Sequence, residues 1–131
     1  SWDLSSGELA PYPPQPAPAP SHFFAGTEGA IALAMGNVIV GSGAYDKDFV
    51  TNWLNISLDE LRDFYKSYTP AWAEKLSGIR ATDIQRMALD FIRAKPRCAA
   101  YTNRGSHAHY NGFNNARPVI LALDRVCSRE W

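Results

Sequence analysis

Start and stop signals for short α-helices recur along the middle of this 131-residue chain and constrain its fold more than any other feature. Ser57 stands three residues before Glu60, which is the capping-box pattern, and Thr69 precedes Pro70, which suits the first position of a helix. Gly78 then acts as a stop, because glycine readily adopts the left-handed conformation that ends many helices. Apolar residues at helical spacing follow these signals, so the sequence predicts a succession of short amphipathic helices.

Five helical segments are predicted before any strand, and they begin near residues 27, 46, 57, 69 and 80. Threonine and serine serve as expected N-caps, and acidic residues in first turns suit the helix dipole. The side chains that we expect to face the core recur at helical spacing and are Ala30, Ile31, Ala34, Met35, Val38, Phe49, Val50, Trp53, Leu58, Leu61, Phe64, Tyr65, Trp72, Ala73, Leu76, Ile84, Met87, Ala88, Phe91 and Ile92.

A single strand is predicted at residues 97–102, "RCAAYT", which form a short apolar run between polar neighbours. The run "ARPVILALDRVC" from Ala116 returns to helix, with Arg117 and Pro118 near its first turn. Helix, strand, polar loop and helix is the order of an α/β unit. We therefore predict a helix-rich α/β fold with five or six helices and a short buried parallel strand near residues 97–102.

Composition limits the number of domains and the kinds of partner. With 46% hydrophobic residues, the chain can build one core, and residues 25–131 are expected to form it. Residues 1–24 include "PYPPQPAPAP", whose six prolines favour an irregular or polyproline strap or linker. Thirteen basic and thirteen acidic residues cancel, so neither nucleic acid nor a membrane surface is an expected partner.

The polar stretch "TNRGSHAHYNGFNNAR" occupies the loop after the predicted strand, where ligands of α/β proteins commonly bind. A glycine-containing loop that leads into a helix can present backbone N–H groups to an anion such as a phosphate. Six side chains could hydrogen-bond that group or a heterocycle, namely Asn103, Arg104, Ser106, His107, His109 and Asn111. A solvated turn without a ligand is the alternative reading of the same residues.

His107 and His109 form an H-x-H pair, which in an extended segment places both imidazoles on one face. Zinc or copper could use such a pair, but two ligands do not make a site. We therefore predict no metal bound directly by this chain. The carboxylate pairs Asp59–Glu60 and Asp46–Asp48 lie in expected first helical turns, where capping explains them, so no catalytic residue is assigned.

Three blocks of this sequence resemble the catalytic subunits of molybdopterin oxidoreductases, the dimethyl sulfoxide reductase superfamily. The run "AGTEGAIALAMGNVIVGSGAYDKDFVTNWL" resembles the family stretch P-G-T-D-x-A-x-x-L-A-M…Y-D-x-x-F-V. "YTPAWAEKLSGIRATDIQRMALDFIRAKPRCAAY" is similar to Y-T-P-E-W-A…T-G-[IV]…F-A…K-P, and "GSHAHYNGFNNARPVILAL" to G-x-x-x-H-x-N-G…R-A-I-x-x-L. The blocks occur in the order and at the spacing of that family.

The resemblance implies that this chain is one part of a larger molybdopterin-binding architecture. The parent enzyme would hold molybdenum or tungsten on two molybdopterin guanine dinucleotides and transfer electrons or oxygen atoms. Gly105, His109, Asn111 and Gly112 match the loop motif that borders the cofactor, with Arg104, Ser106 and His107 as neighbours and Asn103 at the start of the loop. The isolated chain is expected to be inactive.

Further expectations concern the rest of the parent enzyme. Its iron–sulfur cluster would lie elsewhere, because no cysteine-rich segment occurs here. The expected partners are the remainder of the catalytic subunit and an iron–sulfur electron-transfer subunit, in the periplasm or cytoplasm of a bacterium, with the periplasm favoured by the resemblance. Two rival functions are a non-catalytic binding or assembly module, with the strap as its docking element, and a small metal-binding protein that uses His107 and His109.

Overall fold

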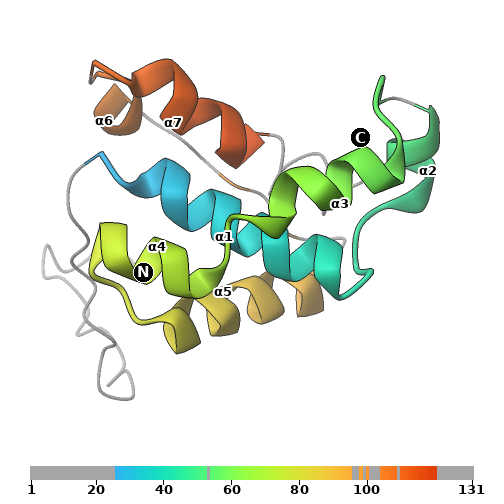
Figure 1. Ribbon diagram of the computed structural model, residues 1–131, viewed down its shortest axis with the longest axis horizontal. Coiled ribbons are helices and arrows are strands. Elements are labelled where there is room, and N and C mark those ends of the chain that lie inside the picture. Colours follow the sequence, from blue (N-terminus) through green and yellow to red (C-terminus); the bar gives the residue numbers. More distant parts are fainter. Residues whose placement is uncertain are drawn as a thin grey trace, which may run out of the picture.

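Helix α1 (Glu28–Gly41) lies at the centre of the fold, and α3, α4, α5 and α7 all contact it (Figure 1). In the computed structural model, the described residues are 26–52, 54–95, 98, 100, 104–108 and 110–120. The other helices of this part are α2 (Lys47–Asn52), α3 (Leu58–Lys66), α4 (Pro70–Ser77), α5 (Ala81–Arg93), α6 (Arg104–His107) and α7 (Gly112–Pro118). The prediction of a helix-rich fold is confirmed.

The predicted strand falls mainly outside the described residues. Of residues 97–102, only Cys98 and Ala100 are described, and neither belongs to a strand. The strand therefore stays a prediction, and within the described ranges the structure consists of helices and turns. The proline-rich strap at residues 1–24 also lies outside them.

Helix α1 is buried on several sides and not along one stripe. Its apolar content is high throughout, and its buried residues are Gly29, Ala32, Ala34, Met35, Gly36, Ile39 and Val40. A helix that is apolar all round suits the centre of a helical domain. The prediction that α1 buries a single face was therefore wrong, because buried residues occur on several sides of the helix. Three residues of the predicted face, Ala30, Ile31 and Val38, are only half-buried.

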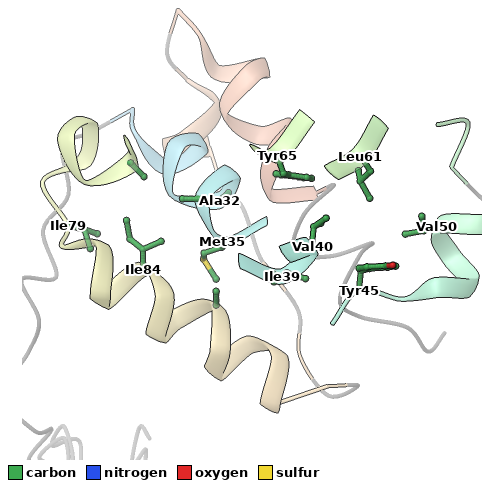
Figure 2. Close-up of a cluster of buried hydrophobic side chains, with 13 residues drawn as sticks. Ala32, Met35, Ile39, Val40, Tyr45, Val50, Leu61, Tyr65, Ile79 and Ile84 are labelled. Carbon is green, nitrogen blue, oxygen red and sulfur yellow. The ribbon is translucent and has the colours of Figure 1, made fainter. Parts of the chain in front are cut away.

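The buried apolar side chains of α1 form one cluster with residues of the surrounding helices (Figure 2). Ile39 and Ile84 are the largest apolar side chains that are completely buried. Tyr45 and Ile79, which lie in turns, also join the cluster and were missed by helical spacing. Three residues predicted to face inward are substantially exposed instead, namely Phe64 at 50%, Leu76 at 46% and Met87 at 36%.

The predicted signals at the ends of α3 and α4 are confirmed. Ser57 N donates to Glu60 Oε2 at 2.7 Å, and Glu60 N donates to Ser57 Oγ at 3.2 Å, which completes the capping box. Thr69 Oγ1 accepts from Trp72 N at 3.2 Å, and Gly78 ends α4 with φ at +78°. At α1 the predicted N-cap position, Thr27, is confirmed, but its side chain makes no capping hydrogen bond.

The capping box also affects the titration of Glu60. The hydrogen bond from the Ser57 backbone N–H is the main cause that lowers the pKa of the Glu60 carboxyl, and the Ser57 hydroxyl adds to it. A lowered folded-state pKa means that the carboxylate stabilises α3 above its unfolded pKa. That contribution is lost as the pH falls through the folded-state pKa.

We expect Ser57→Ala to destabilise the chain by about 0.5–2 kcal/mol, because the Glu60 backbone N–H then loses its side-chain acceptor. Urea unfolding followed by circular dichroism measures the change. Thr51→Ala, at an exposed hydroxyl that bonds only the Lys47 carbonyl within α2, is the matched control and should cost less. Equal losses in the two variants would contradict the role of the capping box.

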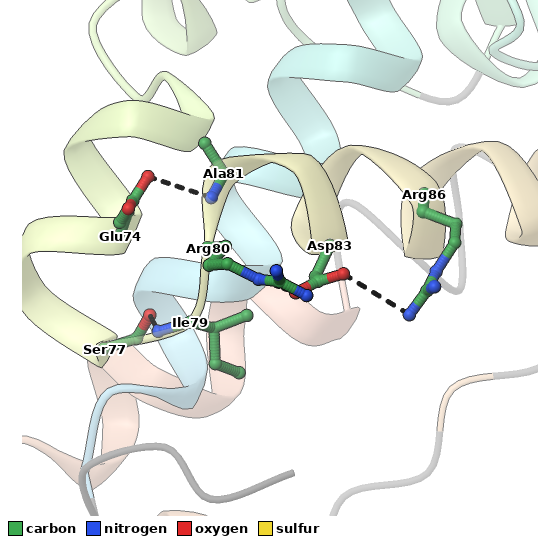
Figure 3. A network of polar contacts seen from close by, with 7 residues as sticks. All are labelled: Glu74, Ser77, Ile79, Arg80, Ala81, Asp83 and Arg86. Atoms are coloured by element: carbon green, nitrogen blue, oxygen red, sulfur yellow. Dashed lines mark hydrogen bonds and ion pairs between the residues drawn. The ribbon is translucent and has the colours of Figure 1, made fainter. Parts of the chain in front are cut away.

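A polar network fixes the turn between α4 and α5 (Figure 3). Glu74 Oε2 accepts from Ala81 N at 3.0 Å, so a side chain of α4 satisfies the first turn of α5. The buried carboxylate of Asp83 pairs with Arg80 Nε at 2.8 Å and with an Arg86 guanidinium nitrogen at 3.4 Å. Two cations offset the cost of burying one carboxylate, which explains why α5 tolerates Asp83 on its inner side.

Candidate functional site

The polar stretch that sequence analysis assigned to an open loop is largely helical. Helix α6 forms one turn at Arg104–His107, and α7 begins at Gly112, four residues before the predicted start at Ala116. Pro118 is consequently the last residue of α7 and not part of its first turn. Because proline lacks a backbone N–H, Pro118 cannot donate within the α-helical ladder, and residues 119–120 continue the chain in a π-helical conformation.

Gly112 allows α6 and α7 to approach closely. A Cβ atom at this position would overlap the carbonyl oxygen of His107, which belongs to the last turn of α6. Glycine is therefore required by backbone proximity, although its φ is not positive. The turn between the helices is further held by Asn114 Nδ2, which donates to Asn111 Oδ1 at 2.7 Å.

Arg104, His107 and Asn111 are predicted site residues whose side chains the structure describes, and all three lie on α6 or in the turn before α7. Arg104 and His107 begin and end α6, and Asn111 immediately precedes α7; all three side chains are exposed. Gly105 and Ser106 lie within α6, and Gly112 begins α7. Asn103 and His109 lie outside the described residues. The structure thus brings six of the eight predicted residues into two adjoining helical turns.

The extended geometry that an H-x-H metal site needs is not adopted at His107, which is helical. His109 lies outside the described residues. Among the described residues, no group of three or more histidine, cysteine, aspartate or glutamate side chains could hold a metal ion.

Helices α6 and α7 together form what we call the polar unit. Asn115 of α7 attaches this unit to the beginning of α1. This buried side chain donates from Nδ2 to the Gly26 carbonyl at 2.9 Å, and Gly29 packs directly against it. A Cβ atom on Gly29 would lie 2.6 Å from Asn115 Oδ1 and 2.9 Å from Asn115 Cα. Sequence reasoning missed Asn115, because a run of asparagines gives no indication of which one is buried.

In the sequence, Glu28 lies between Gly26 and Gly29, the two residues that contact Asn115. Its carboxylate carries an unsatisfied hydrogen-bond acceptor. Its Oε2 atom is buried and has no hydrogen-bond partner in the described part of the chain. A buried carboxylate oxygen normally accepts at least one hydrogen bond. The start of α1 therefore carries an unsatisfied acceptor next in sequence to Gly29, which packs against Asn115 of α7.

Cys98 follows α5 on the way to this unit. Partial burial raises the pKa of its thiol above the usual range, and the positive charge of Lys95 opposes that shift only in part. The thiol is therefore mostly protonated at neutral pH, which does not suit a nucleophile.

Comparison with known proteins identifies relatives of this chain. No family model matches the chain. It is 31% identical over 115 residues to the arsenate respiratory reductase molybdopterin-containing subunit ArrA of Chrysiogenes arsenatis, which corresponds to 62% of this chain and 13% of that protein. It is 32% identical over 94 residues to formate dehydrogenase H of Escherichia coli strain K12, which corresponds to 72% of this chain and 13% of that protein.

The fold of this chain is also similar to that of a solved structure. Acetylene hydratase from Pelobacter acetylenicus matches with a TM-score of 0.71 and 25% identity over 80% of this chain and 14% of the solved chain. This chain corresponds to a partial region of a molybdopterin oxidoreductase of the dimethyl sulfoxide reductase family. The resemblance drawn from the three sequence blocks is thereby confirmed. The chain spans about one seventh of the length of these molybdopterin oxidoreductase relatives.

No helix among the described residues of this molybdopterin oxidoreductase segment is long and apolar enough to cross a membrane.

Proposed function

We propose that this chain is part of the catalytic subunit of a molybdopterin-dependent oxidoreductase and that α6 and α7 form a wall of its cofactor site. The observation that carries the proposal is the attachment of the polar α6–α7 unit to the start of α1 through Asn115. This attachment ties the segment that carries Arg104, His107 and Asn111 to the start of α1, where Glu28 has an unsatisfied oxygen.

The chemistry of these side chains fits a molybdopterin guanine dinucleotide. Arg104 supplies a planar cation that suits a phosphate, and His107 and Asn111 supply directional hydrogen bonds. The unsatisfied Glu28 oxygen suits an N–H donor of a pterin or guanine ring. When bound, the cofactor supplies the metal-centred electron or oxygen-atom transfer.

The chain itself would bind, orient and shield the cofactor. The proposed cofactor consists of two molybdopterin guanine dinucleotides that hold molybdenum or tungsten. Asn103 and His109 are proposed as further residues that contact it. An iron–sulfur cluster elsewhere in the parent enzyme, an iron–sulfur electron-transfer subunit and a bacterial periplasmic location complete it. The relatives that share this region include an arsenate respiratory reductase subunit, a formate dehydrogenase and an acetylene hydratase, so the proposal concerns the cofactor and not one substrate.

Arg104→Ala in the assembled enzyme tests this assignment. We expect a loss of bound molybdopterin, measured as its fluorescent oxidation product, with a parallel loss of molybdenum or tungsten by mass spectrometry. A lost charge-assisted contact of about 1.5–3 kcal/mol corresponds to about a tenfold to hundredfold weaker affinity.

Arg93→Ala is the matched control, because Arg93 is an exposed arginine of α5 whose one ion pair within the described part of the chain is with Asp90. It should leave the cofactor content unchanged. If Arg104→Ala retains full molybdopterin and full activity, the wall assigned to α6 and α7 is wrong.

A further inference from the structure

One face of α7 presents apolar side chains to the surface. Phe113 and Arg117 are spaced i, i+4 on α7, and Ile120 lies just beyond its end in the π-helical residues 119–120; Phe113 is 78% exposed and Ile120 is 48% exposed. These residues and Ala116 line an open depression of about 360 Å³. The opposite side of α7 is occupied, because Asn115 and Gly112 are buried.

A second apolar hollow adjoins the first. It lies between α7 and α3, has a volume of about 320 Å³, and is lined by Leu54, Ile56, Glu60, Leu61, Phe64, Tyr65 and Arg117. Phe64 is 50% exposed and Ile56 is 39% exposed along its rim. Arg117 lines both hollows, so together they form one surface, which we call the α3–α7 groove. Figure 1 shows α7 leading towards α3 at this place.

The groove combines apolar walls with charged groups on its rim. Glu60 is already engaged by Ser57, whereas the Arg117 guanidinium has no hydrogen bond or ion pair to any residue in the described part of the chain. A contiguous exposed apolar patch with a polar rim is typical of a surface that another polypeptide covers. An unpaired arginine beside it favours a partner segment that carries a carboxylate.

We propose that the α3–α7 groove is a docking surface for an amphipathic segment of the remaining catalytic subunit, with apolar side chains against Phe64 and Phe113 and an acidic side chain against Arg117. The inference rests on the proposed function, in which this chain is part of a larger enzyme. The same fold occupies only 14% of the acetylene hydratase chain, so most of such a protein is available to cover this face. An amphipathic helix laid into an apolar groove is a common mode of recognition.

The docking of the segment is tested by photo-crosslinking in the assembled enzyme. The photoreactive residue p-benzoylphenylalanine replaces Phe64 in one variant and Phe113 in another, which preserves an aromatic ring at each position. After irradiation, peptide mass spectrometry should find both positions linked to one segment outside residues 1–131 that contains apolar residues and an aspartate or glutamate. Arg117→Glu should reduce this crosslink about tenfold, and Arg117→Lys should largely retain it, because like charges oppose docking.

The control places the same photoreactive residue at Asp63, an exposed α3 position next to Phe64 in the sequence that does not line the groove. It should not link to the same segment. Crosslinks only to residues 1–25 or 121–131, only to a second copy of this chain, or to nothing would overturn the proposal. Molybdopterin content is measured on the same samples: crosslinks without cofactor would overturn only the proposed function, and cofactor without crosslinks only the docking surface.

Discussion

Ile84→Ala is expected to destabilise the chain by about 2–5 kcal/mol. Ile84 lies on α5, is completely buried, and belongs to the cluster around α1 (Figure 2). Truncation removes three carbon atoms from a site enclosed by rigid helices, so the lost transfer free energy adds to the cost of a cavity. Urea unfolding of the full chain, followed by tryptophan fluorescence, measures the loss.

Two variants calibrate this expectation. Ile84→Val removes one methyl group and should cost about 0.5–1.5 kcal/mol. Met87→Ala lies on the same helix, and the sequence assigns Met87 to the same apolar stripe, yet its side chain is 36% exposed. We expect a clearly smaller loss for Met87→Ala than for Ile84→Ala, and equal losses would show that the assigned burial is wrong.

Gly112→Ala is expected to open the contact between α6 and α7. The added methyl group would overlap the His107 carbonyl, and a backbone atom cannot move aside as the end of a flexible side chain can. Overpacking of this kind typically costs about 1–3 kcal/mol. Because the same turn presents Arg104, His107 and Asn111, the assembled enzyme should also lose bound molybdopterin.

Gly41→Ala is the matched control for this substitution. Gly41 is the last residue of α1, and a Cβ atom there would meet nothing within 4 Å. Because alanine favours helix more than glycine does, we expect Gly41→Ala to be neutral or to stabilise the chain by up to about 1 kcal/mol. If Gly112→Ala unfolds at the same urea concentration as the wild type, the close approach of the two helices is not required.

The polar unit shows where local sequence signals mislead. Asparagine, glycine and histidine are typical of turns, so the sequence from residue 103 to 115 predicts a loop. The structure contains α6 and the start of α7 there instead, and Asn115 faces inward because it satisfies the Gly26 carbonyl. The buried partner lies 89 positions away in the sequence, and no local pattern can indicate a contact of that range.

The core shows the same division between local and tertiary information. Helical spacing correctly placed Leu61, Ala73, Ile84 and Ala88 inside the fold. Phe64 satisfies the same spacing on α3, yet it borders the α3–α7 groove because no described helix covers that side. Spacing identifies the apolar face of a helix, whereas the neighbours of the helix decide how much of that face is buried.

The sequence by itself determined the beginnings of α3 and α4 and the end of α4, because Ser57, Glu60, Thr69 and Gly78 act on backbone groups within a few residues of themselves. It also determined the family, through three blocks in a fixed order. Only the tertiary structure decided that α1 is central, that Gly29 and Gly112 must lack side chains, and that Asn115 joins α7 to α1. Those features depend on the distance between segments far apart in the chain, which is set by packing and not by local propensity.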